Sequence, residues 1–367
     1  MKGKKVVFLN YIPSPYRVDF FNELSKKIDL NVIFYNKSMD NSPWKKEEKK
    51  REFNHTFLFE QSKLKGIFKL FKLLRSHRND ILVVGGYYLL PEIFTIFYCI
   101  FFRKEFILSS DGGFVTKGFF KTSFKKFLIG SANYWLSSGK NTTETLKYYG
   151  AKEKDIYEYH FTSIFNNELV NNIPDKETLY KERESLGLNP DVFYLTFVGQ
   201  LVHRKGVDVL IEALKHDTKK NFETLIIGSG EQEDELKKMV LDSDLDHNKI
   251  HFLGKLTKNE ILKYLKVSDA FVCPSREDIW GLVLNEAIAN GLPLISTKNV
   301  GAAYSLIEEG ENGYIVDVDN PEQLIEKINL LFGEKLNLMK MNSINKAKKY
   351  TIEQMVDDHL VLFNKLS

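Results

Sequence analysis

Cysteine is scarce in this sequence. Only Cys99 and Cys273 occur among 367 residues, which excludes a disulfide framework and a cysteine-rich zinc site and favours a reducing compartment. Long uncharged apolar runs are also lacking. The strongest candidate, residues 89–102, is too short to span a membrane and contains Glu92. The N-terminal apolar run is too short for a signal peptide. We therefore expect a cytosolic chain without a spanning helix.

Charge is unevenly distributed along the chain. The net charge is only +3, yet residues 1–170 hold 28 Lys and Arg against 17 Asp and Glu, and the remainder holds 24 against 32. The first half also contains 21 of the 28 phenylalanines. With 43% hydrophobic residues the chain is globular, and its length predicts two domains. The halves are thus expected to meet different partners, an anionic one for the basic half.

Short β-branched runs alternate with helical patterns in both halves, which predicts an α/β fold with two Rossmann-like, doubly wound domains. Residues 1–170 would form the first domain, 171–189 a polar linker and 190–349 the second domain. The last 25 residues read as an amphipathic helix, with Thr351 as a candidate N-cap for its final part. The terminal helix, about 350–367, is expected to pack back on the first domain.

The segment 275–293, SREDIWGLVLNEAIANGLP, carries the densest signal. Asp278 and Glu286 lie eight positions apart, one before a predicted helix and one inside it. Between them, the free N–H groups of Gly281, Leu282 and Val283 would form an anion site at the helix N-terminus. Amides suit a phosphate and carboxylates suit sugar hydroxyls, so the pattern favours a nucleotide-sugar site.

A second cluster, residues 197–208 (FVGQLVHRKGVD), has the same strand–turn–helix pattern. Its glycine, Gly199, is followed by two adjacent cations, Arg204 and Lys205. Cations on such a turn would balance the charge of a departing diphosphate.

These motifs resemble glycosyltransferase family 4, whose members are retaining enzymes of the GT-B fold with two domains facing a central cleft. The resemblance is strong over Phe193–Phe332 and weaker over Tyr11–Leu24. It implies that Glu286 binds the donor ribose, that Asp278 holds the transferred sugar and that Lys205 contacts the diphosphate. It also implies donor contacts from the matched positions Gly199, Gln200, Gly281, Leu282 and Val283. The segment formed by Leu253, Gly254, Lys255 and Leu256 matches the one whose backbone reads the base of the donor.

The sequence departs from the family pattern at three places. The first acid of the motif is Asp278 rather than Glu, with Glu277 just before it, so either could reach the sugar. Gln200 stands where the family usually has Arg, so Arg204 is expected to share the diphosphate role. The family's histidine in the first domain is missing, and Asp111 is the candidate that approaches the acceptor there.

The resemblance implies a retaining hexosyltransferase that moves a sugar from a nucleotide-sugar, with UDP expected, to a saccharide or an undecaprenyl-type lipid-linked acceptor in cell-surface polysaccharide synthesis. No cofactor and no metal are expected. Three alternatives remain open: a GT-B phosphorylase or synthase, a sugar-nucleotide epimerase, or a catalytically silent donor-binding or scaffold subunit. Nucleic-acid binding is disfavoured because the basic half has no reader motif.

Two basic amphipathic segments indicate contact with an anionic membrane surface. In Lys63–Arg78, apolar residues recur at helical spacing among Lys and Arg, and Phe119–Ile129 is similar. Helices of this kind lie in anionic interfaces. The alternative is that both are ordinary surface helices packed on the sheet. The expected location is the inner face of the cell membrane, with peripheral attachment.

Overall fold

The computed structural model describes residues 5–37, 49–60, 62–115, 118–216 and 222–367. Its backbone contacts divide the chain into two compact units. The first unit consists of residues 1–163 and 351–367, and the second unit of residues 164–350. The chain therefore returns to the first unit for its last seventeen residues, which contain the helix α14 (Ile352–Leu366).

The first unit contains a seven-stranded parallel sheet in the order β3-β2-β1-β4-β5-β6-β7. The strand order reverses between β1 and β4, as in a doubly wound fold. The strands are β1 (Val6–Asn10), β2 (Leu30–Phe34), β3 (Asn54–Phe57), β4 (Ile81–Val84), β5 (Ile107–Ser110), β6 (Tyr134–Ser137) and β7 (Ile156–Glu158). The helices are α1 (Pro15–Ser25), α2 (Lys63–Ser76), α3 (Leu90–Phe102), α4 (Phe119–Gly130), α5 (Lys140–Tyr148) and α14.

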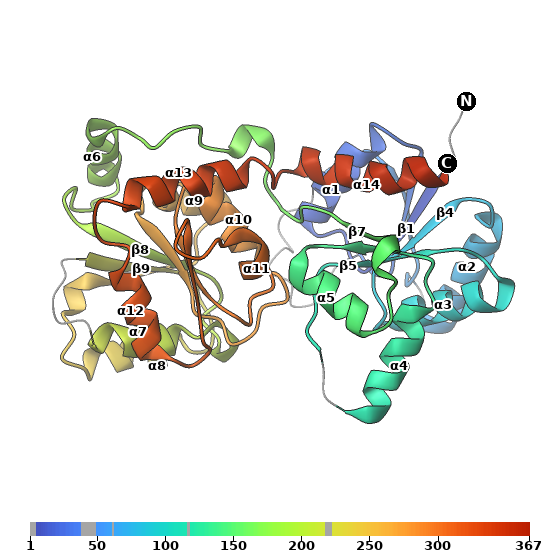
Figure 1. The fold of residues 1–367 in the computed structure, drawn as a ribbon, viewed down its shortest axis with the longest axis horizontal. Helices are drawn as coiled ribbons and strands as arrows, with labels where there is room; N and C mark the ends of the chain where they lie inside the picture. Colours follow the sequence, from blue (N-terminus) through green and yellow to red (C-terminus); the bar gives the residue numbers. More distant parts are fainter. Residues whose placement is uncertain (1–4, 38–48, 61, 116–117, 217–221) are drawn as a thin grey trace. The chain divides into compact units, whose positions relative to one another are not determined.

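The second unit contains a six-stranded parallel sheet in the order β10-β9-β8-β11-β12-β13. The strands are β8 (Phe193–Val198), β9 (Phe222–Ile227), β10 (Ile250–Gly254), β11 (Ala270–Cys273), β12 (Leu294–Thr297) and β13 (Gly313–Val316). The helices are α6 (Lys176–Ser185), α7 (Val207–Lys215), α8 (Glu233–Leu241), α9 (Lys258–Val267), α10 (Leu282–Ala289), α11 (Ala303–Leu306), α12 (Pro321–Asn329) and α13 (Leu336–Ala347). In Figure 1, α9, α10 and α13 lie on one face of this sheet and α7, α8 and α12 on the other.

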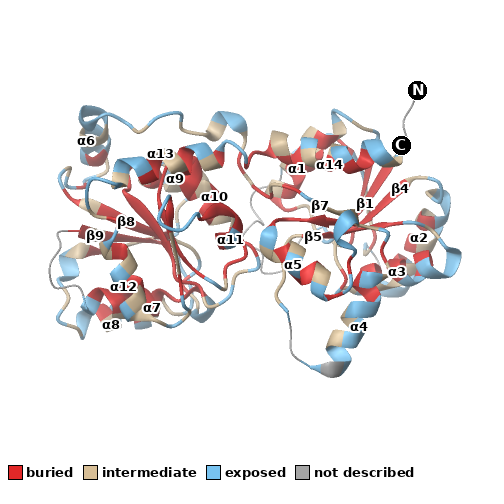
Figure 2. Cartoon of the chain, viewed as in Figure 1, coloured by how far each residue is buried: buried red, intermediate tan, exposed pale blue. Residues whose placement is uncertain are grey.

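Burial follows the layers of each unit. The central strands are buried over most of their length, and the flanking helices turn exposed surfaces outward (Figure 2). In the first unit, Phe8 of β1 contacts Phe20 and Phe21 of α1 and Phe363 of α14 with edge-on ring geometry. Part of the phenylalanine excess of the first half is thus core packing, and it anchors the C-terminal helix.

The expected fold class, two Rossmann-like α/β domains, is confirmed, but residues 171–189 are not a linker. They belong to the second unit and include α6. Arg183 of α6 is buried and donates hydrogen bonds to the Val267 carbonyl and the Asp269 carboxylate, the latter at 2.6 Å. The buried and paired Arg183 fixes α6 against the sheet. The segment was predicted to be a linker because its composition is polar.

Candidate functional site

Two loops of the second unit meet at Lys205 and Asp278. Lys205 ends a short 3-10 helix, His203–Lys205, that follows β8, and Asp278 lies in the loop after β11. The Lys205 ammonium forms an ion pair with the Asp278 carboxylate, and both side chains are mostly buried. Because β8 and β11 are parallel neighbours, their carboxyl ends bring these residues together. Two residues predicted to act on the donor are thus in direct contact.

Close backbone packing holds the Lys205 loop in place. Gly206 has a φ of +68°, and a Cβ there would lie 2.1 Å from the carbonyl oxygen of Pro274. In the loop after β9, a Cβ on Gly228 would lie 1.8 Å from the carbonyl oxygen of Gly199. Only glycine permits such approaches. Of these glycines only Gly199 was predicted from the sequence, although a glycine directly after a strand or before a helix, as at Gly228 and Gly206, is a signal for close packing.

The start of α10 provides free amide groups beside Asp278. Gly281 precedes the helix with a φ of +93°, and a Cβ there would lie 2.7 Å from a methyl carbon of Val300. The N–H groups of Leu282 and Val283 lie in the first turn, where a helix has no partners for its amides. The structure therefore places the predicted anion-binding amides in the same loop region as the ion pair, at the positive end of the helix dipole.

A neighbouring loop supports the segment that carries Asp278. The Asp278 N–H donates to the Asn299 carbonyl at 3.0 Å, and the Gly301 N–H donates to the Asp278 carbonyl at 3.1 Å. Below the segment, the buried Trp280 donates from its indole nitrogen to Asn285 at 2.9 Å. The loop around Asp278 is thus held at both ends by hydrogen bonds.

Arg204 and Glu277 differ from their neighbours in exposure. Both are exposed, whereas Lys205 is buried and Asp278 is half-buried. Arg204 reaches the side-chain oxygen of Gln200 at 3.4 Å, a long and weak contact. The adjacent acids are therefore not equivalent: Asp278 is paired with Lys205, and Glu277 is turned toward solvent.

Arg276 is a residue that the sequence analysis missed. Its guanidinium pairs with Asp208 at 2.6 and 2.8 Å and with Asp319 at 2.7 Å. The backbone N–H of Arg276 donates to the Arg204 carbonyl at 2.8 Å. The hydrogen bonds that the guanidinium donates to Asp208 raise the pKa of Arg276. Arg276 thus ties the loop after β11 to the Arg204 loop, and nothing in the sequence around it signals this role.

Glu286 lies inside α10 and differs from the other acids of the site. It is half-buried, and burial raises the pKa of its carboxyl to about 7, with Lys258 lowering it and Glu168 raising it. Lys258 and Glu168 pair with each other at 2.6 Å. Within the described part of the chain, no residue donates a hydrogen bond to the Glu286 carboxylate. The group is therefore available to a ligand hydroxyl.

The predicted base-reading segment, residues 253–256, lies at the end of β10. Gly254 has a φ of +67°, with open space where a Cβ would stand. Its carbonyl accepts from the Gly228 N–H at 2.8 Å. Since β9 separates β10 from β8, the segment lies about 10 Å from the Gly199 loop along the same edge of the sheet. This spacing suits a base and a diphosphate on one nucleotide.

Asp111, the candidate for the acceptor, belongs to the first unit. It follows β5 and forms an ion pair with the buried Arg17 of α1. The Tyr159 hydroxyl donates to the other carboxylate oxygen at 2.8 Å. Burial lowers the pKa of Arg17 and the Asp111 charge raises it, with a net increase. Asp111 is thus held by two partners, which the sequence did not indicate.

No group of three or more His, Cys, Asp or Glu side chains in the described residues could hold a metal ion. The same residues contain no helix that combines the length and the apolar character needed to cross a bilayer.

Comparison with known proteins shows what this chain is similar to. Residues 180–350 match the family model "Glycosyl transferases group 1". An uncharacterised glycosyltransferase of Methanocaldococcus jannaschii is 32% identical over an alignment that covers 54% of each chain. The O-antigen biosynthesis glycosyltransferase WclY of Escherichia coli is 23% identical over 99% of this chain and 95% of its own length. The resemblance to glycosyltransferases is confirmed, although the alignment to the M. jannaschii protein spans only about half of that protein.

Solved structures show the same fold over the whole chain. The Anabaena protein HepE, crystallised with UDP, superposes with a TM-score of 0.79 at 15% identity, covering 98% of this chain and 100% of that chain. The lipopolysaccharide biosynthesis glycosyltransferase WaaG covers 98% of this chain and 99% of its own, with a TM-score of 0.67 and 17% identity. The predicted GT-B architecture of two Rossmann-like units is therefore confirmed.

Proposed function

We propose that this chain is a retaining glycosyltransferase that moves a sugar from a UDP-sugar to a saccharide or lipid-linked saccharide during cell-surface polysaccharide synthesis. The observation that carries the proposal is the arrangement in the second unit. It consists of the Lys205–Asp278 pair, the amides at the start of α10 and the carboxylate of Glu286, which has no hydrogen-bond donor among the residues that the structure describes. A cation, helix amides and two acids offer groups for a diphosphate and for sugar hydroxyls.

Bond cleavage in such a donor places negative charge on the departing diphosphate. Lys205, buried and already positioned by Asp278, offers a fixed positive charge, and the amides of Leu282 and Val283 add the helix dipole. In the resting site Asp278 neutralises Lys205. Once a donor is bound, its diphosphate would pair with the Lys205 ammonium in place of Asp278, and its sugar hydroxyls would donate hydrogen bonds to the Asp278 carboxylate.

Retention requires that the new bond forms on the face from which the diphosphate leaves. In the proposed reaction, the C1–O bond to the diphosphate breaks and the acceptor oxygen bonds to C1 from that same side. The acceptor proton passes to the leaving diphosphate. No protein nucleophile is needed, so the site functions by binding and by charge stabilisation. Asp111, held by Arg17 and Tyr159, would then orient the acceptor as part of a fixed network.

The choice of donor and acceptor draws on the relatives. HepE was crystallised with UDP, and WclY is named for O-antigen biosynthesis. These names support a UDP-sugar donor and a surface-polysaccharide acceptor for this chain. The basic first half, with its excess of Lys and Arg, suits an anionic or membrane-held acceptor.

A donor panel tests this function. The full chain is incubated with UDP-, GDP- and ADP-sugars. A UDP-sugar should raise its melting temperature most, because only the correct base makes its full set of contacts with the segment 253–256. With labelled donor and a lipid-linked or oligosaccharide acceptor, NMR of the product should show the anomeric configuration of the donor. An inverted product would exclude retention. Donor binding with no turnover for any acceptor would favour a silent binding subunit, and sugar isomerisation without acceptor would identify an epimerase.

We also propose that the first unit binds an anionic membrane, at the inner face of the cell membrane, through the outer surface of α4. Phe120, Phe124 and Phe127 recur at helical spacing and are 86%, 47% and 49% exposed. Phe127 contacts the exposed Phe97 of α3, with ring centroids 5.8 Å apart. Lysines 121, 125 and 126 lie on the same helix. Aromatic side chains beside lysines suit the interface of an anionic bilayer.

The other predicted membrane segment, α2, fits this role less well. Of its apolar residues, Leu74 is buried, and Ile67 and Phe71 are half-buried against the core of the first unit. Leu64 and Phe68 are exposed. The helix thus uses much of its apolar face to cover the sheet, which is the alternative that the pattern also allowed.

Flotation with vesicles tests the membrane proposal. The chain should float with phosphatidylglycerol-containing vesicles at low salt and be released at high salt, since ion screening weakens attraction between surface charges. Replacing Phe120, Phe124 and Phe127 together by Ser should abolish flotation while donor-induced stabilisation persists. A matched triple replacement of Leu241, Leu330 and Leu338, which are exposed in the second unit, serves as the control. Equal flotation of both variants, or binding indifferent to lipid charge, would contradict the proposal.

A further inference from the structure

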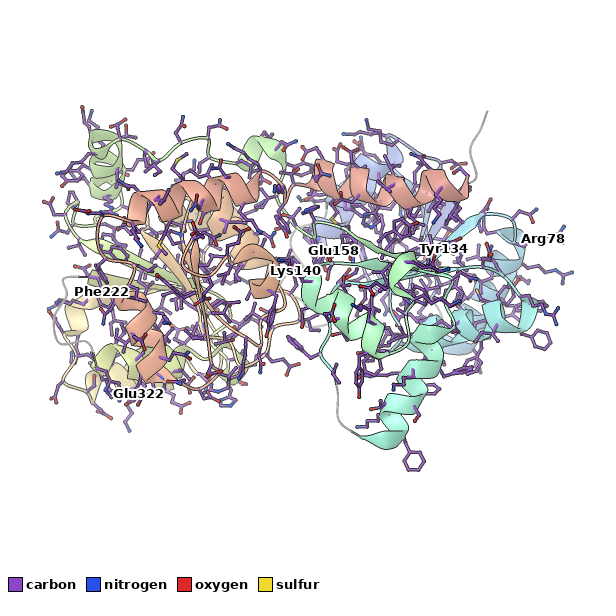
Figure 3. The ribbon with its side chains drawn as sticks, viewed as in Figure 1. Arg78, Tyr134, Lys140, Glu158, Phe222 and Glu322 are labelled. Atoms are coloured by element: carbon purple, nitrogen blue, oxygen red, sulfur yellow. The ribbon has the colours of Figure 1, made fainter. Side chains whose placement is uncertain are left out.

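A cavity of about 640 Å³ opens in the first unit at the amino ends of β4, β5 and β6. Ile81, Ile107 and Tyr134, the first residues of these strands, line it. Asp111 follows the opposite, carboxyl end of β5, about 10 Å away along a four-residue strand. In Figure 3, Arg78 beside the cavity and Lys140 and Glu158 at the carboxyl-end edge lie at opposite sides of the unit. The cavity is therefore separate from the acceptor region proposed above.

The cavity has the size and walls of a small-molecule site. Its volume lies within the range of pockets that hold drug-sized ligands. One wall consists of three aromatic rings: Tyr98 contacts Phe102 with ring centroids 4.6 Å apart and Phe71 with centroids 5.8 Å apart. Such a wall favours a ligand that carries an apolar or planar body.

Cations outnumber acids around the cavity by four to two. Arg75, Arg78 and Arg103 are exposed and, within the described residues, have no carboxylate partner. The fourth cation, Lys104, donates to the carbonyls of Arg78 and Asp80 at 2.9 and 2.8 Å. Both of these bonds are made to backbone carbonyl oxygens.

The two acids do not cancel this excess. Asp80 is paired with the ring nitrogen Nδ1 of His77 at 2.7 Å, and Glu105 is exposed. The phenol of Tyr98 has a raised pKa because it is buried, and the charges of Arg75 and Arg78 lower it. Arg75 and Arg78 line the same cavity as Tyr98, so their guanidinium groups can act on a ligand that packs against the aromatic wall.

Arg103 adds a further observation. It ends α3 in the left-handed conformation, with a φ of +52°, and it is one of two non-glycine residues with a positive φ in the described chain. Glycine is the usual residue at such a helix end, because a side chain there is strained. An arginine at this place keeps a guanidinium at the cavity at a cost in backbone strain.

We propose that this cavity binds an organic phosphate, with the phosphate held by the guanidinium groups of Arg75, Arg78 and Arg103 and the carbon body against Tyr98, Phe102 and Phe71. Phosphate matches the fork of several guanidinium donors, and its two negative charges match the excess of cations. This site is independent of the proposed glycosyl transfer.

Binding of 1-naphthyl phosphate to the full chain, followed by calorimetry, tests the site. Removing two charge-assisted contacts in the double variant R75A/R78A should weaken binding by at least about tenfold. The variant K65A/K72A removes two exposed charges from α2, the helix that carries Arg75, at positions outside the cavity lining, and should bind like the unchanged protein. Equal affinity of R75A/R78A and the unchanged protein would overturn the proposal. So would the absence of measurable binding by the unchanged protein both to 1-naphthyl phosphate and to the phosphatidic acid vesicles described below.

Arg103→Gly separates a ligand role from a structural one. Glycine relieves the left-handed strain, so the melting temperature should rise while affinity for 1-naphthyl phosphate falls. A variant that is more stable and binds equally well would remove Arg103 from the site.

The source of the phosphate is distinguished by a second probe. Phosphatidylcholine vesicles with and without phosphatidic acid are compared for flotation of the R75A/R78A and K65A/K72A variants. Selective loss of phosphatidic acid binding in R75A/R78A identifies a lipid headgroup as the ligand. Binding of soluble 1-naphthyl phosphate alone, with equal flotation of both variants, identifies a soluble phosphate ester.

Discussion

Lys205→Met should lower kcat for sugar transfer by about 10²–10³-fold, the effect of removing one fixed charge that stabilises a transition state. The lysine is mostly buried and paired with Asp278, so its charge is positioned before the donor arrives. The expected loss is larger than that of Arg204→Met, because Arg204 is exposed and makes only a 3.4 Å contact with Gln200. Initial rates with saturating donor measure both variants.

Stability must be separated from chemistry in this experiment. Lys205→Met leaves the Asp278 carboxylate without its partner, which destabilises a half-buried acid. The double variant K205M/D278N removes both charges and should regain stability but not activity. Lys205→Arg keeps the charge and should retain part of the rate. Full activity of K205M at a temperature where it is folded would contradict a role for Lys205 in the departure of the diphosphate.

Glu286→Gln should lower kcat/KM by about 10²-fold, because a carboxylate that accepts from hydroxyl groups is replaced by a neutral amide. In the free protein burial raises the pKa of Glu286 to about 7. Donor hydroxyls bind the ionised form better, so donor affinity of the unchanged protein should rise from pH 6 to pH 8 and then level off. In Glu286→Gln this pH dependence should disappear. Calorimetric titration with a UDP-sugar across this range provides the measurement.

The same variant should gain stability as it loses activity. A folded-state pKa raised above the usual value of a glutamate means that the folded protein holds the proton more tightly than the unfolded chain. The stabilising proton is therefore present below the unfolded pKa and is lost as pH rises through about 7. We expect Glu286→Gln to raise the free energy of unfolding by about 2 kcal/mol at pH 8, because it removes a buried charge that destabilises the folded state.

A matched exposed glutamate, Glu326→Gln on α12, should change neither stability nor transfer appreciably. If Glu286→Gln lost activity together with stability, the carboxylate would have a structural role. If it kept full activity, the proposed donor site would be wrong.

Much of the fold could be predicted because periodicity reports burial. Strands such as β1 and β4 are buried on both faces and read as continuous apolar runs. The edge strands β3 and β7 carry no such signal, since they are short, partly exposed and polar. The terminal helical pattern proved to be two helices, α13 and α14, belonging to different units, and Thr351 caps the second by accepting from the Gln354 N–H at 3.3 Å.

For the site, residue types and spacing within one segment were sufficient to identify the acids of the 275–293 motif and the cations near Gly199. A sequence shows which charges follow a strand, but it does not show which charge pairs with which across the sheet. The partners of Asp111, namely Arg17 and Tyr159, come from α1 and from the segment after β7.

By itself, the sequence determined the two doubly wound α/β units and the loops that carry the residues of the proposed donor site, because apolar periodicity and glycine placement act over a few neighbouring residues. Only the tertiary structure decided that Asp278 rather than Glu277 pairs with Lys205, and that Glu286 has no hydrogen-bond donor among the described residues. It also decided that Arg75, Arg78 and Arg103 gather at one cavity. These properties depend on distance and burial between segments far apart in the chain, and burial is what raises the pKa of Glu286.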